Sequence, residues 1–209
     1  MFVIMFDLML ASLLLLVSTN GQIIDKLLDP VIDVNFAAYE GLWLNALTSK
    51  NVWPGQNSSF CVRAKYDLIS TDPVAMFSVV NEYSAMSPSG EVRGGVGLLT
   101  QSSPPVPQGS LTVTFAGMSQ EFEYRIIRLS TIQNNYYAWA VIYSPVMDVI
   151  FVNYREEIDF DNADNDLDAL GVYLNSLPLN PKIPLLTKTE ILSRVSQLHP
   201  AQCDYTINL

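Results

Sequence analysis

Residues that commonly build enzyme and metal sites are scarce in this chain. It has one His and two Cys among 209 residues. We find no H-E-x-x-H, G-x-S-x-G, C-x-x-C or P-loop motif. A nucleophile and its base would have to be built from acids and hydroxyls alone, and His199 is given no role. The sequence therefore predicts no catalytic residues and no cofactor.

Basic residues are also few. Lys and Arg number 11 against 21 Asp and Glu, so the formal net charge is −10. The basic residues are scattered, whereas binding to phosphates requires them to be clustered. This composition excludes nucleic acid as a partner.

The acids do not form a recognisable calcium loop. Asp164, Asp166 and Asp168 alternate as in an EF-hand, but that loop also requires Gly at 169 and Glu at 175. The chain has Ala169 and Asn175 at those positions. We interpret the run as a solvated acidic cap on a following helix, and we predict no metal site.

Long apolar runs are missing except at the N-terminus. The run Leu8–Val17 is followed by small and polar residues, which is typical of a signal peptide although no basic residue precedes it. It is shorter than the roughly 20 residues needed to span a bilayer. We expect a signal peptide over 1–21 and a single secreted domain over 22–209 that is not transmembrane.

Secretion bears on the two cysteines. Cys61 and Cys203 are the only pair available, and an extracellular chain is expected to join them as a disulfide, the alternative being two free thiols. Asn57 begins an Asn-Ser-Ser glycosylation sequon.

Between Trp43 and Arg155 short alternating apolar runs are separated by turn residues, a pattern typical of an antiparallel sandwich or barrel. We predict strands near 41–47, 60–69, 75–83, 91–100, 110–116, 121–129, 136–144 and 148–155. Eight antiparallel strands can close into a barrel that holds one small ligand. The fold class is therefore all-β, an up-and-down barrel over about 41–155.

The residues after the barrel are predicted to be mainly helical. Leucines at one-face spacing predict a helix over about 165–177, packed on the outside of the barrel. In the tail, 178–209, residues 183–187 are compatible with a further strand. Ile191, Val195 and Leu198 suggest a short second helix.

Four motifs resemble the lipocalin family, and within it the apolipoprotein D-like group that includes insect bilin-binding proteins. They are Gly41-x-Trp43, the strand from Cys61 to Tyr66, Val79-Val80-Asn81, and the late Arg155. The resemblance covers roughly 34–203. It implies that Trp43 and Arg155 meet at the closed end of the barrel and have a structural role, together with Gly41.

An apolar interior with a few polar groups would bind a small hydrophobic molecule such as a lipid, fatty acid, steroid, retinoid or bilin. The resemblance implies Tyr66, Asn81 and Phe151 as ligand-binding residues. Alternation and aromatic content add Phe77, Val113, Phe115, Tyr124 and Trp139. Two alternatives stay open, a filled barrel that acts through protein–protein interaction and a ligand-isomerising enzyme.

Two further expectations concern the barrel's polar contacts and its mouth. If Tyr124 faces inward, alternation places Arg128 inward as well, where it could hold a carboxylate. The loops at the open end carry Trp53, Met86, Met118 and Met147. An apolar rim of this kind could make transient contact with a lipid surface.

Overall fold

The expected barrel is present. A computed structural model of the chain describes residues 27–49, 59–155, 164–177, 187–198 and 203. The expected signal peptide, the Asn57 sequon and residues 183–186 of the expected late strand lie outside these residues. All the structural statements below concern the described residues.

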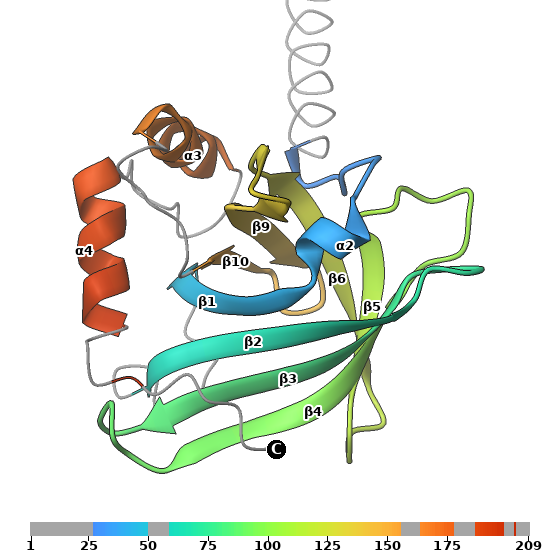
Figure 1. Cartoon of the computed structure of the whole chain (residues 1–209), viewed down its shortest axis with the longest axis horizontal. Coiled ribbons are helices and arrows are strands. Elements are labelled where there is room, and N and C mark those ends of the chain that lie inside the picture. The colour runs from blue at the N-terminus through green and yellow to red at the C-terminus, as the bar shows by residue number, and fades with distance from the viewer. Residues whose placement is uncertain (1–26, 50–58, 156–163, 178–186, 199–202, 204–209) are drawn as a thin grey trace, which may run out of the picture.

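Eight strands pair antiparallel around a closed ring. Their order is β1-β10-β9-β6-β5-β4-β3-β2, so each strand neighbours the next barrel strand along the chain and β1 closes on β10. The strands are β1 (Gly41–Thr48), β2 (Ser59–Ser70), β3 (Met76–Ala85), β4 (Val92–Gln101), β5 (Ser110–Phe115), β6 (Glu121–Leu129), β9 (Trp139–Ser144) and β10 (Val149–Tyr154). Figure 1 shows β2, β3 and β4 running side by side.

The strand predictions are confirmed with one change. The segment expected as a single strand over 136–144 divides into β8 (Tyr136–Tyr137) and β9. β8 pairs with β7 (Ile132–Gln133) in a small hairpin outside the barrel sheet. Asn134 and Asn135 form its turn, both with positive φ, a conformation that Asn tolerates better than most residues.

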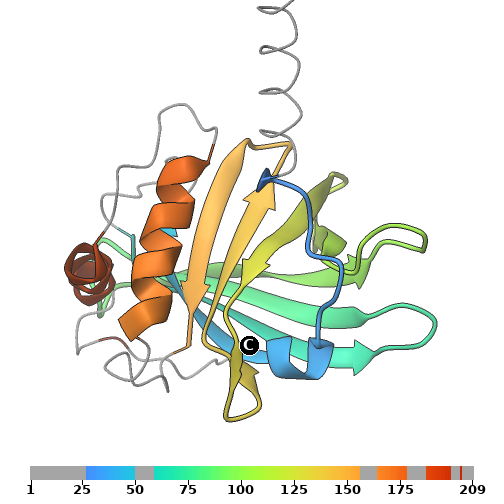
Figure 2. The ribbon, with the colours of Figure 1, turned by 90° about the horizontal axis from the view of Figure 1, so that it is seen from above.

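Helices cover one side of the barrel. The expected helix is α3 (Asp164–Ser176), and the expected second helix is α4 (Lys188–Leu198). Leu167, Leu170 and Leu174 of α3 are buried against the outer faces of β1, β9 and β10. Figure 2 shows α3 lying along β9 and β10. This outer core is separate from the core inside the barrel.

No helix was predicted at α2 (Phe36–Tyr39), which has four residues and precedes β1. The side chain of Asn35 caps it by accepting a hydrogen bond from the amide of Ala38, 3.2 Å away. Tyr39 and Trp43 are both fully buried. The indole Nε1 of Trp43 donates to the Tyr39 carbonyl at 2.8 Å, which fixes the helix to the first strand.

Arg155 joins the last strand to this start of the barrel. Its guanidinium lies 4.1 Å from the ring centroid of Trp43. It donates to the carbonyl oxygens of residues 38, 39, 40 and 42. Gly41 makes the approach possible, because a Cβ at this position would lie 2.6 Å from Nη1 of Arg155. Its φ of +109° is also one that other residues rarely adopt. The predicted meeting of Trp43 and Arg155 is confirmed.

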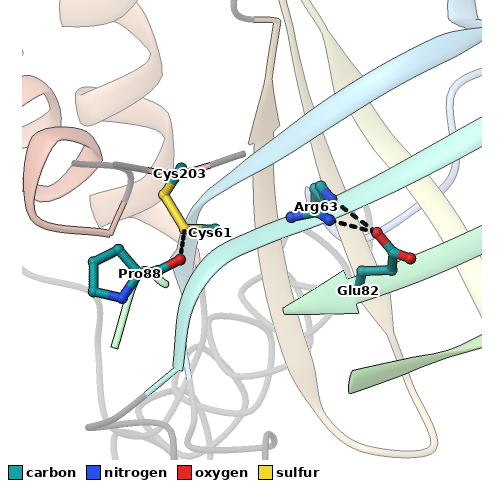
Figure 3. A network of polar contacts seen from close by, with 5 residues as sticks. All are labelled: Cys61, Arg63, Glu82, Pro88 and Cys203. Carbon is teal, nitrogen blue, oxygen red and sulfur yellow. Dashed lines mark hydrogen bonds and ion pairs between the residues drawn. A yellow bond between two sulfur atoms is a disulfide. The ribbon is translucent and has the colours of Figure 1, made fainter. Parts of the chain in front are cut away.

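A disulfide and a buried ion pair lie on the outward side of β2 (Figure 3). Cys61 and Cys203 are bonded, as expected, across a sequence separation of 142. Arg63 and Glu82 form an ion pair at 2.6 Å whose side chains are only 2% and 4% exposed. Arg63 precedes Ala64 of the inner core, so it faces outward, and its burial shows that this part of the outer face is covered.

We expect Arg155→Lys to lower the free energy of unfolding by about 2–4 kcal/mol, because an ammonium cannot satisfy several carbonyls as a planar guanidinium does. Urea unfolding followed by tryptophan fluorescence measures the loss. Arg128→Lys is the matched control. Arg128 also lies over an aromatic ring, that of Tyr173 at 4.4 Å, but its side chain makes no hydrogen bond to the backbone of the described residues. Equal losses in the two variants would contradict the role given to Arg155.

Candidate functional site

The barrel interior collects most of the residues predicted to bind a ligand. Tyr66, Phe77 and Val113 are buried in the inner core, and Phe115, Tyr124 and Phe151 pack against it with partly exposed side chains. Asn81 pairs across the sheet with Ala64 and Gly95, and Ala64 belongs to the inner core. Cross-strand partners share a face, so Asn81 also points inward. Seven of the eight predicted residues therefore share one space: 66, 77, 81, 113, 115, 124 and 151.

Trp139 is the exception, and its predicted inward placement is wrong. It packs in the outer core beneath α3, whereas its strand neighbours Ala140 and Ile142 belong to the inner core. Because α3 covers this part of the barrel, β9 is apolar on both faces. Alternation alone therefore could not identify which face is inside.

Arg128 also differs from expectation. The pairing of β6 with β9 shifts register between Ile126 and Arg128. This bulge places Ile126 in the inner core and Ile127 in the outer one. Arg128 then stacks on Tyr173 of α3, outside the barrel. The suggestion that it holds a ligand carboxylate inside the barrel is therefore wrong.

Aromatic rings seal the interior near the closed end. Tyr39 lies between Trp43, with ring centroids 5.0 Å apart, and Tyr66, at 5.5 Å. Phe77 makes an edge contact with Phe36 at 5.9 Å. Tyr39, Trp43 and Phe77 are each 0% exposed. We call these five residues the aromatic floor.

Three tyrosine hydroxyls meet at the inner side of this floor. The Tyr124 hydroxyl lies 2.6 Å from that of Tyr39 and 3.1 Å from that of Tyr66. Burial raises the pKa of Tyr66 to about 12 and raises the pKa values of Tyr39 and Tyr124 well above their usual value. At neutral pH all three hydroxyls are protonated, so each can donate a hydrogen bond.

The half of the interior away from the aromatic floor is lined by aromatic rings that are only partly buried. Phe115, Phe122 and Phe151 point inward near the open ends of their strands and are partly exposed. The Phe115 ring lies against β4, where a Cβ on Gly97 would be 2.9 Å from it. A Cβ on Gly95 would meet only this ring, at 3.8 Å. The missing side chain of Gly97 thus lets the Phe115 ring pack against β4, and the missing side chain of Gly95 leaves space beside the ring.

Sequence reasoning missed a polar network inside β1 and β10. Asn45 donates to the side chain of Asn153 at 3.0 Å, and Thr48 donates to Asn45 at 3.0 Å. The pairing of β1 with β10 shifts register between Asn45 and Leu47. The side-chain amide of Asn45 also donates to the Leu47 carbonyl at 3.2 Å, so this carbonyl has a hydrogen-bond partner beside the register shift. The sequence signal for this network was an Asn among apolar residues in each strand, Asn45 in β1 and Asn153 in β10.

The connections β3–β4, β5–β6 and β9–β10 lie at the same end of this up-and-down barrel. Each carries an exposed apolar side chain: Met86 is 84% exposed, Met118 is 56% and Val146 is 56%. Met147 is 37% exposed. Trp53, also expected at this rim, lies outside the described residues.

Among the described residues, no group of three or more His, Cys, Asp or Glu side chains is placed to hold a metal ion. The helices described in the structure include none with the length and apolar character needed to cross a membrane.

Comparison with protein-family models gives no match, and comparison with curated proteins gives none. Ten chains of solved structures match. One is apocrustacyanin C1, which is 16% identical, with 74% of this chain and 81% of that chain covered and a TM-score of 0.49. The assignment of a closed eight-stranded barrel rests on the strand pairing of the chain itself.

We expect the tyrosines of the floor to make stability fall at alkaline pH. The pKa of Tyr66 is about 12 when folded against 10 in the ordinary state, so the unfolded chain loses this proton first. Stability from Tyr66 is therefore complete below pH 10 and decreases by about 1.4 kcal/mol per pH unit above it, until the folded pKa is reached.

Urea unfolding between about pH 9 and 11 measures this decline. The free energy of unfolding should fall less steeply with pH for Tyr66→Phe than for the wild type, by a difference that approaches the contribution of one proton, about 1.4 kcal/mol per pH unit. Tyr136→Phe provides the same substitution at a 45% exposed position. Identical slopes for the wild type and Tyr66→Phe would contradict the raised pKa.

Proposed function

We propose that this chain is a secreted lipocalin-like carrier, related to the apolipoprotein D-like group, that binds a small hydrophobic ligand inside the barrel. One observation carries the proposal: the interior is sealed by aromatic rings at one end and lined by partly exposed inward-facing rings at the other. A barrel packed solid throughout would bury both sets alike.

The chemistry of the interior supports binding of an apolar molecule. Phe115, Phe122 and Phe151 supply apolar contact, and Asn81 and the tyrosine hydroxyls supply a few polar groups. This combination is typical of small-molecule sites. Binding needs no catalytic group, so we propose a non-enzymatic role.

Secretion is part of the proposal. The N-terminal apolar run supports a signal peptide, and the Cys61–Cys203 disulfide is of the kind that persists in oxidising compartments. Asn57 would then carry a glycan.

Gly95→Leu tests whether the interior is open. The new side chain would enter the interior without meeting backbone, since a Cβ there contacts only the Phe115 ring. We expect binding of the fluorescent probe N-phenyl-1-naphthylamine to weaken at least about tenfold, which corresponds to about 1.4 kcal/mol. Val96→Leu is the matched control, because Val96 is the next residue of β4 and is 43% exposed.

The wild-type protein provides a second readout. Its absorption spectrum and mass spectra of solvent extracts should reveal a co-purified hydrophobic molecule, and a coloured protein would point to a bilin. Wild type that yields an empty extract and does not bind the probe would favour the filled barrel acting through protein–protein interaction.

We further propose that the rim formed by Met86, Met118, Val146 and Met147 contacts a lipid surface while the ligand is transferred. Connections from one end of the barrel present these residues, and the first three are more than half exposed. Clustered apolar side chains at one end favour an apolar surface, whereas scattered ones are ordinary.

We expect flotation with phosphatidylcholine vesicles to recover less Met86→Ser/Met118→Ser protein than wild type. Ile132→Ser/Val172→Ser is the control, since these residues are 45% and 64% exposed on β7 and α3, away from the rim. Equal recovery of wild type and the rim variant would exclude this mode of docking.

A further inference from the structure

The three tyrosine hydroxyls that meet at the floor have more protons than acceptors. Tyr39, Tyr66 and Tyr124 carry three hydroxyl protons, and the two contacts among them use two. Within the described part of the chain, no other hydrogen bond from these three hydroxyls is present. One proton is therefore left without an acceptor in a buried setting, which is costly unless something else accepts it.

Tyr124 is the residue best placed to offer the remaining proton. It stands between the other two hydroxyls and can accept from both, which leaves its own proton free. Tyr39 is 0% exposed and Tyr66 is 4% exposed, whereas Tyr124 is partly exposed. Phe122, two residues earlier on β6, also points into the more open half of the interior. A ligand in this more open half could therefore reach the remaining hydroxyl proton.

The group that fits this hydroxyl accepts a hydrogen bond and donates none. Both lone pairs of the Tyr124 oxygen are occupied when Tyr39 and Tyr66 donate to it, so a ligand alcohol or amine would bring a proton with no acceptor. A carboxylate would lack a counter-ion there, because Arg155 is already bound to several carbonyls and Arg128 lies outside. A neutral carbonyl meets both conditions.

We propose that the barrel selects a hydrophobic ligand carrying a ketone, aldehyde or ester carbonyl, held at its deep end by the hydroxyl of Tyr124. The inference rests on the proposed carrier function. It adds a ligand class to it, an apolar body with one acceptor-only group.

The test uses two probes that differ in one group. Undecan-2-one has a carbonyl oxygen where 2-methylundec-1-ene has a CH₂ of similar size. Displacement of N-phenyl-1-naphthylamine gives the dissociation constant of each, and their ratio cancels effects common to both probes. We expect Tyr124→Phe to shift this ratio against the ketone by about three- to tenfold, the value of one neutral hydrogen bond.

Two further variants sharpen the result. Tyr66→Phe leaves Tyr39 and Tyr124 with two protons for one contact, so the ketone preference should persist. Tyr143→Phe removes a tyrosine hydroxyl from the outer face, where it donates to Asp148, and should leave the ratio unchanged. A purely structural role for Tyr124 would weaken both probes equally and overturn the proposal, as would a preference lost only in Tyr66→Phe.

A spectroscopic measurement needs no variant. Isotope-edited infrared spectra of ¹³C-labelled undecan-2-one bound to the wild type should show a carbonyl stretch lower in frequency than in dry alkane. An unshifted stretch overturns the inference while leaving the carrier function intact. Wild type that binds neither probe would instead contradict the carrier function, and this inference with it.

Discussion

The guanidinium of Arg155 is the point on which the closed end depends. This one planar cation stacks on Trp43 and donates hydrogen bonds to the carbonyls that end α2. The contact is possible only where residue 41 lacks a Cβ. The start and the end of the barrel are therefore held together by the guanidinium of Arg155, the indole of Trp43 and the missing side chain of Gly41. The aromatic floor packs next to this contact.

What faces the interior is decided by two register shifts as much as by alternation. One shift in β1 brings Thr48 into contact with Asn45 inside the barrel. The other, in β6, turns Arg128 out toward α3. A bulge changes which residues point inward without leaving a clear mark in the local composition. The chemistry of the interior is consequently more neutral than the unbroken pattern suggests.

The strands and their order could be predicted because they follow from local signals, alternation and turn residues. The joint at Arg155 was implied by the motifs that resemble a known family. Trp139 could not be placed, since a helix covering one face makes both faces of β9 apolar. Tyr39 was missed because a four-residue helix has too few positions to show periodicity. Its hydroxyl becomes relevant only when strands far apart in sequence bring Tyr66 and Tyr124 beside it.

The bond between Cys61 and Cys203 joins residues 142 positions apart. Most of the barrel lies inside that covalent loop, including β3 to β10. A protease that cuts one peptide bond anywhere in the loop would thus leave a single molecule of unchanged mass apart from the added water. The two pieces would separate on a gel only after reduction, and a nicked barrel could keep its strands paired.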